Sequence, residues 1–323
     1  MGASKIQQHI KLDLALIRDA IAIENEDAKS ADALGYMARV LTQCTIPHRN
    51  PKTRFYKRTN GDLTITIADV NEVGMPYGSI PRLLLAWLTT EAVITKDRTI
   101  ILGDSLNQFI RSLDMIPSGG RWGTATRLKD QMARLFGCTI GYKVENDSSL
   151  HLAQTKIARE VHLWWDPRQP EQTTVWNSHV MLDHDFFEEI IRSPVPVDMR
   201  ALTALKRSPM ALDIYIWLTY RMSYLSRRTE ISWEQLQLQM GAGYGFDEHG
   251  RENFQKAFTK HLRIGAYGLQ GCPGQPGARP PGSASQSHPH PKNPVAGLHL
   301  IDPSSIRSQV IHRSLLTGEV IHE

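Results

Sequence analysis

The sequence predicts an α+β protein that is mainly helical and contains two related domains. The chain has 323 residues, and at roughly 100–200 residues per domain this length suits about two domains. Apolar residues recur at helical spacing in several segments, and alternating runs typical of strands lie between these segments. The helical part of the first half also recurs, more weakly, about 130 residues later.

The clearest stretch predicts three helices followed by two strands. A turn-rich segment at 74–78 leads into the first helix, which has Pro81 in its first turn. The expected elements are a strand at 63–70, a helix at 79–95, a strand at 98–102, helices at 105–115 and 124–136, and strands at 138–144 and 149–157. Three helices and a hairpin are the outline of a winged helix, a variant of the helix-turn-helix.

Three matches in the same order indicate that this tri-helical domain is duplicated. The tripeptide Trp-Leu-Thr at 87–89 recurs at 217–219, in a helix expected from 209 to 225. Ser105 opens the second helix of the first copy as Ser232 opens its counterpart. The third helices share apolar positions at a constant offset, with Leu128, Met132 and Phe136 matching Phe254, Phe258 and Leu262. We therefore expect two tandem winged-helix domains.

These elements divide the chain into four parts. We expect a helical N-terminal extension at 1–40, a first winged-helix domain with extra strands at 41–195, a second winged-helix domain at 196–265 and a tail at 266–323. The tail is dominated by Gly, Pro and Ser between residues 271 and 294, so it lacks the apolar surface that would offset the entropy of ordering. We expect disorder there. We also expect the hairpin of the second winged helix to be missing or replaced.

Composition points to a soluble cytoplasmic protein. The 37 Lys and Arg residues exceed the 33 Asp and Glu residues by only four, so total charge does not identify a partner. The three cysteines are widely scattered, which favours neither a disulfide framework nor a four-ligand zinc site. No signal-peptide pattern opens the chain, and no apolar run is long enough for a membrane span, so no membrane partner is expected.

The distribution of charge indicates DNA binding. The helix at 250–263 places an acid-free polar stripe opposite its apolar face, and the stripe consists of Asn253, Lys256, Lys260 and Arg263. The helix at 124–136 repeats this division, with Arg127, Gln131 and Arg134 on its polar side. Arg and Asn suit base readout, whereas Lys more often supplies charge to phosphates. Both stripes are also compatible with an ordinary solvated helix face.

Two further cations belong to this predicted DNA-binding set. Arg121 lies in the glycine-rich turn ahead of the helix at 124–136, where it could touch a phosphate backbone. Trp122 beside it could share this contact or pack the turn against the core, and packing is the expectation that we favour. Lys143 lies on the hairpin expected to form the wing, from which it could reach a minor groove.

Catalytic interpretations find little support in the residues. The turn at 119–124 lacks the Gly-Lys-Ser/Thr ending of a P-loop. A metal-dependent nuclease is a possible alternative, with His179, Asp183, His184 and Asp185 as candidate ligands. However, Asp183 is equally well placed to cap a helix through Phe186 and Ile190. We expect a non-enzymatic protein without a cofactor or metal.

Three motifs of the sequence form a distinctive set, namely GMPYGSIPRLLLAWL at 74–88, GDS at 103–105 and GGRWG at 119–123. Through them the sequence resembles the plasmid-encoded RepA replication initiators of bacteria, over about 35–265. It implies two winged-helix domains that bind repeated sequences at a plasmid origin, open the duplex and recruit host replication proteins. It also implies possible dimerisation through the first winged helix. A winged-helix transcriptional regulator remains the alternative, because both classes bind repeated sites.

Overall fold

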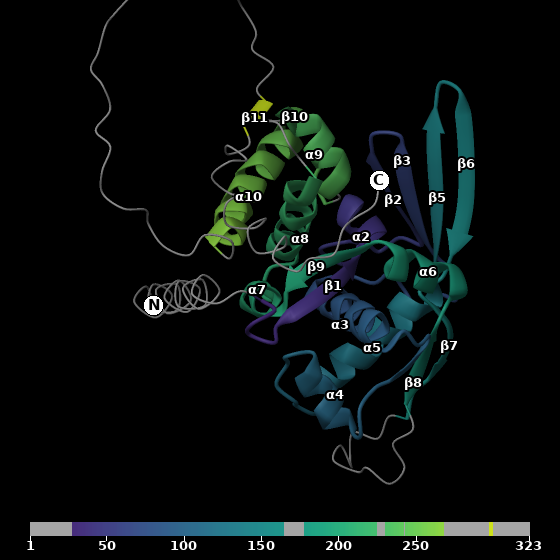
Figure 1. The fold of residues 1–323 in the computed structure, drawn as a ribbon. Helices are drawn as coiled ribbons and strands as arrows, with labels where there is room; N and C mark the ends of the chain where they lie inside the picture. Colours follow the sequence, from purple (N-terminus) through teal and green to yellow (C-terminus); the bar gives the residue numbers. More distant parts are fainter. Residues whose placement is uncertain (1–27, 165–177, 225–229, 242, 268–296, 300–323) are drawn as a thin grey trace, which may run out of the picture.

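The computed structural model describes residues 28–164, 178–224, 230–241, 243–267 and 297–299. Within them the fold is mixed α/β (Figure 1). The expectation of a mainly helical protein is too loose, because three separate sheets form between residues 34 and 198. Most of the N-terminal extension expected at 1–40 and most of the tail expected at 266–323 lie outside the described residues.

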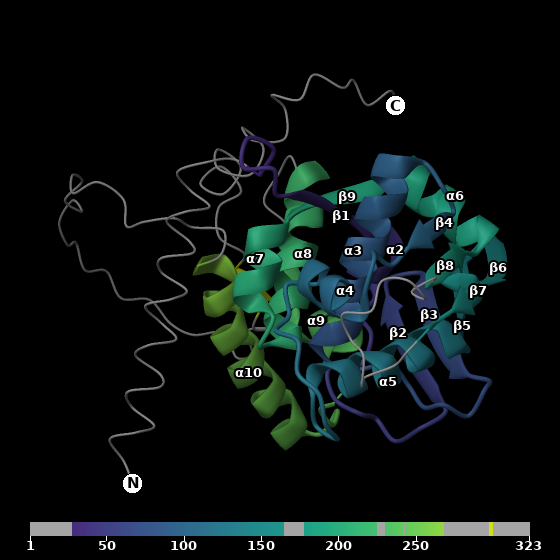
Figure 2. The same cartoon turned by 90° about the horizontal axis from the view of Figure 1, so that it is seen from below.

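Helix α3 (Ser79–Thr95) lies in the middle of the molecule, and its bounds are those expected from the sequence. Its residues are apolar on most sides, and Leu84, Leu85 and Leu88 are at most 2% exposed. A helix that is apolar all round needs partners all round. Figures 1 and 2 show elements from both halves of the chain around it, among them strand β1 (Leu34–Ala38) and helix α8 (Pro209–Tyr224).

A four-stranded antiparallel sheet forms one side of the molecule. Its order is β2 (Phe55–Asn60), β3 (Leu63–Asp69), β5 (Cys138–Asn146) and β6 (Ser149–Thr155). Tyr56, Ile65, Ile67 and Ile140 point to the core from alternate positions, as a half-buried sheet requires. The hairpin β5–β6 was expected to complete the first winged helix, but it pairs with β3 instead.

A second sheet contains the strand that follows α3. Its order is β4 (Thr99–Ile101), β8 (His179–Leu182) and β7 (Ala158–His162), all antiparallel. The strands that continue β4 are therefore β7 and β8, which come later in the chain than the expected hairpin. Alternation along a strand shows which face is buried but not which strand pairs with it.

The residues before α3 are not all helical, although helix was expected up to residue 40. Strand β1 pairs antiparallel with β9 (Pro194–Asp198), so the boundary expected between 195 and 196 falls within a strand. Three short helices lie near this pair, namely α2 (Arg39–Gln43), α6 (His184–Arg192) and α7 (Met199–Leu205). The pairing of β1 with β9 overrides any local helical tendency.

The first unit, defined as α3, β4, α4 (Leu106–Ser112) and α5 (Thr124–Gly137), has the same order of elements as a second unit. The second unit consists of α8, β10 (Glu230–Ser232), α9 (Trp233–Met240) and α10 (Glu248–Tyr267). Ser105 caps α4 by accepting from Gln108 N–H at 3.2 Å, and Ser232 caps α9 by accepting from Gln235 N–H at 3.2 Å. Strand β11 (Gly297–His299) pairs with β10.

Helix α8 belongs to both hydrophobic cores. One side of it adds Ala211, Leu212, Tyr215 and Ile216 to the large core around α3. The other side adds Met210, Ile214, Trp217 and Leu218 to a second core with Leu236 and Met240 of α9 and Phe254 and Phe258 of α10. This sharing explains why α8 is apolar nearly all round. The two units are therefore joined through a common helix.

Candidate nucleic-acid interface

The outer side of α10 presents the expected polar stripe to solvent. Phe254 and Phe258 are fully buried on its inner side, whereas Asn253, Lys256 and Lys260 are exposed. The Lys256 ammonium pairs with Glu252 at 3.2 Å, but an exposed pair one turn apart is weak and is easily exchanged for another anion. The fourth predicted residue, Arg263, has a side chain outside the described part of the structure.

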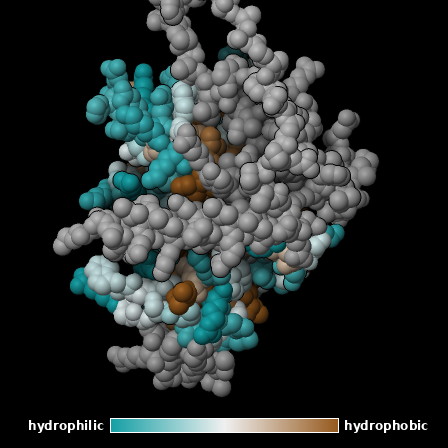
Figure 3. Space-filling model, turned by 90° about the vertical axis from the view of Figure 1, so that its left-hand side faces the viewer, coloured by the Kyte–Doolittle hydropathy of each residue, from teal (hydrophilic) through white to brown (hydrophobic). Residues whose placement is uncertain are grey.

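On the side of the molecule where α10 lies, the described atoms are largely hydrophilic. Figure 3 views the molecule from the side on which α10 lies in Figure 1, and the described atoms at its upper left are mostly teal. Small hydrophobic patches lie among them. A polar, cationic helix face on the outside of the molecule has the chemistry needed to approach phosphates and base edges.

The polar side of α5, unlike that of α10, makes contacts within the protein. Arg127 is exposed, but Gln131 is buried, with only 4% of its surface accessible. The side-chain oxygen of Gln131 accepts a hydrogen bond from Tyr77 N–H at 2.9 Å. Its amide donates to Asp130 at 3.1 Å. The expectation that Gln131 reads DNA is wrong in this structure, because its polar atoms hold the segment ahead of α3.

Arg134 is engaged by the same segment. Its Nε donates to Asp130 at 2.9 Å, its Nη1 donates to the Met75 carbonyl at 3.4 Å, and its guanidinium lies 5.5 Å from the Tyr77 ring centroid. These contacts leave Arg134 partly buried. The segment from Gly74 to Tyr77 therefore covers much of the polar face of α5, and Arg127 is the predicted α5 contact that remains free to meet DNA.

The turn before α5 exposes both of its large side chains. Trp122 is 80% exposed, so the expectation that it packs against the core is wrong. The Arg121 guanidinium lies over the Trp122 ring at 5.2 Å from its centroid. Arg121 is also exposed, as a phosphate contact requires.

Lys143 lies on β5 rather than on the sheet that contains β4. It is directly opposite Thr64 on one side and Leu152 on the other. Its ammonium forms an ion pair with Glu145. The structure therefore moves Lys143 away from the position expected for a wing residue, and an acidic neighbour offsets its charge.

A buried cluster of charged groups joins the two units. Arg82 of α3 forms a bidentate pair with Asp213 of α8, with both N–O distances at 2.6 Å. Its remaining N–H groups donate to the carbonyls of Ile46, Pro47 and Gly78. His48 Nε2 lies 2.7 Å from Asp213. The sequence contains Arg82 within the most distinctive motif, but nothing in its local pattern indicated this partner 131 residues away.

The protonation of this cluster follows from burial and charge. Burial lowers the pKa of His48 below 6.5, and the hydrogen bond to Asp213 opposes that effect. Burial would by itself raise the pKa of Asp213, but the Arg82 guanidinium and the hydrogen bonds from His48 and Arg82 hold it below its usual value. Asp213 is therefore a carboxylate that neutralises Arg82 between the units.

One of the possible metal ligands, Asp183, caps a helix instead. Asp183 accepts hydrogen bonds from Asp185 N–H at 3.1 Å and from the Thr155 hydroxyl at 2.9 Å, so it caps α6. His179 stacks on His162 with ring centroids 5.6 Å apart. Within the described residues, no group of three His, Cys, Asp or Glu side chains is placed to hold a metal ion.

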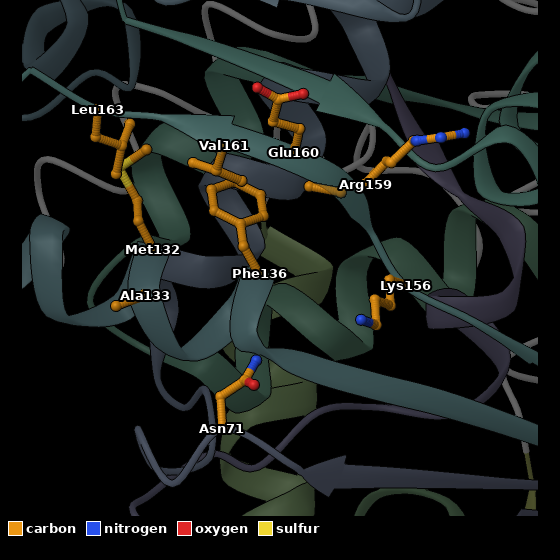
Figure 4. Close-up of a pocket in the computed structure, with 10 residues that line it drawn as sticks. Asn71, Met132, Ala133, Phe136, Lys156, Arg159, Glu160, Val161 and Leu163 are labelled. Carbon is orange, nitrogen blue, oxygen red and sulfur yellow. The ribbon is translucent and has the colours of Figure 1, made fainter.

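A cleft of about 310 Å³ lies between α5 and β7. In Figure 4, Met132 and Phe136 rise from α5 towards Val161 and Leu163. Lys156, Arg159 and Glu160 add charges to its lining. Apolar and charged side chains therefore line this cleft together. It lies on the opposite side of α5 from Arg127.

The matches with known proteins concern the middle of the chain. Residues 75–235 match the family described as "Plasmid encoded RepA protein". These residues belong to the plasmid-encoded RepA family. The RepA match begins in the segment that covers α5, includes all of the first unit and ends in α9, so α10 lies beyond it. The middle of this chain is therefore a RepA region, as the sequence motifs indicated.

Two other comparisons complete this result. No curated protein matches the sequence. Among solved structures, domains 2 and 3 of RctB match with 13% sequence identity and a TM-score of 0.45, covering 67% of this chain and 80% of that one. No helix in the described part of the chain is both long and apolar enough to cross a membrane.

Proposed function

We propose that this protein initiates plasmid replication by binding repeated double-stranded sequences at a plasmid origin. The observation that carries the proposal is the RepA match over 75–235, in a chain whose two units repeat one order of elements. Duplicated DNA-binding units suit a protein that reads repeated sites. The protein acts by binding rather than by catalysis, without a cofactor, in the bacterial cytoplasm where the plasmid lies.

Each unit is proposed to be a winged helix. Strand β4 of the first unit pairs with β8, and β8 pairs with β7, so the three helices of this unit are accompanied by three antiparallel strands. In the second unit, β10 pairs with β11. The third helix of such a fold is usually the recognition helix that contacts base edges. We therefore propose that α10 and, to a smaller extent, α5 contact the DNA.

The chemistry of α10 suggests how the origin is read. Lys256 and Lys260 dock on phosphates, and this contact releases counterions and makes binding salt-dependent. Asn253 has the paired donor and acceptor that match adenine in the major groove. Arg127 and Arg121 add charge from the first unit. Strain on an adjacent A·T-rich segment then favours opening of the duplex, and host replication proteins are recruited to the opened DNA.

Dimerisation through the first winged-helix domain, expected at 41–195, is part of the same proposal. Strand β6 forms one edge of the four-stranded sheet, and its Leu150 and Leu152 are 59% and 65% exposed. An exposed edge strand with apolar side chains is suited to pair with another chain. Replacing Leu152 with Lys should shift a dimer towards monomer in sedimentation experiments, whereas an unchanged mass distribution would contradict this assignment.

A footprint on the DNA that flanks its own gene tests the main proposal. Protected repeats spaced by whole helical turns are expected. A cloned copy of that DNA together with the gene should then maintain a plasmid, which a pure transcriptional regulator would not support. Nicking of supercoiled origin DNA in magnesium, manganese or zinc would instead favour a nuclease. Absence of any protected site would overturn the proposal.

A further inference from the structure

Trp122 is an exposed aromatic side chain that the proposed contacts of α10 do not use. It lies two residues before the start of α5, and 80% of its surface is accessible. Exposing an indole to water is unfavourable, so a side chain held in this way commonly marks a contact site. Its ring already carries the Arg121 guanidinium at 5.2 Å from the centroid.

The turn that holds Trp122 is firmly built. Gly123 N–H donates to the Gly120 carbonyl at 3.1 Å, and Thr124 N–H donates to the Ser118 hydroxyl at 2.9 Å. The Thr126 hydroxyl donates to the Gly120 carbonyl at 2.8 Å. A Cβ at Gly123 would overlap the carbonyl oxygens of Ser118 and Gly119, so the tight turn requires glycine. Trp122 is therefore displayed by an ordered turn.

The charge around Trp122 favours an anionic partner. Residues 115–129 contain three cations, Arg121, Arg127 and Lys129, and no Asp or Glu. All three cations are exposed. A planar aromatic ring flanked by cations matches a nucleotide, which offers a flat base and a phosphate at a short distance. An acidic or purely apolar protein surface would match only one of these two features.

The second unit also has an exposed aromatic residue just before its third helix. Phe246 lies two residues before the start of α10 and is 50% exposed. Asp247 follows it and accepts a hydrogen bond from Gly250 N–H at 2.8 Å, which fixes the entry into the helix. Asp247 and Glu248 make this turn less favourable for a phosphate than the turn at Trp122. The aromatic residue before the third helix is thus common to both units, but its surroundings are more cationic in the first.

We propose that Trp122, supported by Arg121, stacks on a DNA base that leaves its neighbours when the origin duplex is distorted or opened, and that Phe246 makes a weaker contact of the same kind. The inference rests on the proposed function and adds a ligand to it, namely an unstacked base beside the duplex site. Base–aromatic stacking does not depend strongly on base identity. Such a contact would favour the open form over the closed duplex.

The experiment compares two DNAs that share one footprinted repeat. One is a complete duplex, and the other contains an unpaired bubble with 2-aminopurine next to the repeat. Trp122→Ala should lose roughly tenfold in affinity for the bubble and lose the quenching of 2-aminopurine, with affinity for the complete duplex unchanged. Trp122→Phe should retain most of both signals, and Phe246→Ala should lose less than Trp122→Ala.

The matched control is Trp164→Ala, which removes another exposed tryptophan, 47% accessible, that lies outside both turns. It should leave both affinities unchanged. Bubble binding by Trp122→Ala equal to that of the unmodified protein would overturn the inference, and so would equal losses on bubble and duplex. If the unmodified protein binds neither DNA, the proposed function itself fails, which is a separate result.

Discussion

The two units have the same order of elements but use their third helices in opposite ways. In α5 the polar face is covered by the segment at 74–77, and Gln131 and Arg134 hold that segment. In α10 the corresponding face is open, and Asn253, Lys256 and Lys260 meet solvent. The comparison shows that an amphipathic helix supplies a polar face, while the elements packed around it decide whether that face supports the fold or meets a ligand.

The two units nevertheless stabilise each other. They share α8, and Arg82 of the first unit is neutralised by Asp213 of the second. The four-stranded sheet also contacts the second unit, because Arg58 of β2 donates to the Leu238 carbonyl in α9 at 3.1 Å. The differences between their third helices are therefore best tested by substitutions that separate stability from DNA binding.

The largest effect is expected when the link between the units is broken. Asp213→Ala leaves Arg82 charged and buried without its partner, which should cost about 3–5 kcal/mol of unfolding free energy. Urea denaturation measures this loss. Glu72→Ala is the control, because it breaks an exposed pair with Arg54 and should cost less than about 1 kcal/mol. Equal losses in the two variants would show that the cluster does not join the units.

The next effect concerns the open face of α10. Replacing Lys256 and Lys260 together with Ala should weaken origin binding by roughly fivefold per lost phosphate contact at 0.15 M salt and reduce the salt slope by about one for each contact. Fluorescence anisotropy at several salt concentrations measures both values. Lys96→Ala, which removes an exposed cation at the end of α3, is the control. An unchanged slope in the double variant would remove α10 from the interface.

On α5, Gln131→Ala should change stability rather than DNA binding. The substitution leaves the Tyr77 N–H without its acceptor and should cost about 1–3 kcal/mol of stability. The affinity for DNA should stay the same, because Gln131 is buried. Lys129→Ala on the exposed side of the same helix should change stability by less than about 0.5 kcal/mol. A reduced affinity for DNA with unchanged stability would place Gln131 at the DNA after all.

The smallest effect is a dependence of stability on pH. The pKa of His48 is lowered in the folded protein, so the unfolded chain binds its proton first as pH falls below about 6.5. The His48 contribution is therefore complete above that pH and is lost below it. His48→Gln should reduce the loss of stability between pH 7 and pH 5.5, while His261, whose pKa is also lowered by burial, retains its share. An identical pH profile would contradict this role for His48.

Local signals predicted the helices well. The bounds of α3 agree with the sequence, α5 extends one residue further, and the caps at Ser105, Asp183 and Ser232 were all readable from residue type and spacing. These features depend on residues within one or two turns of each other. Strand β2 was missed, although Asn60 and Gly61 form a typical hairpin signal between alternating residues, and Gly61 has the positive φ of 57° that such a turn needs.

Features that depend on distant partners could not be predicted in this way. The periodicity of β5 and β6 identifies a hairpin but is the same whether it pairs with β3 or with β4. The helical wheel of α5 separates polar from apolar residues, but it contains no information about the segment at 74–77 that covers the polar side. The exposure of Trp122 was missed for the same reason, because its chemistry alone favours burial.

Two buried cysteines in the described part of the chain report separately on two contacts of the fold. Burial raises the pKa of both the Cys44 and the Cys138 thiols to about 12, so almost no reactive thiolate exists at neutral pH while the protein is closed. Cys44 lies between Gln43 and Thr45, which hydrogen-bond to α9, and Cys138 lies beside Gly74 at the end of α5. The rate of Cys44 alkylation therefore reports how often the segment at 43–45 leaves α9, and the rate of Cys138 alkylation reports how often the end of α5 parts from Gly74.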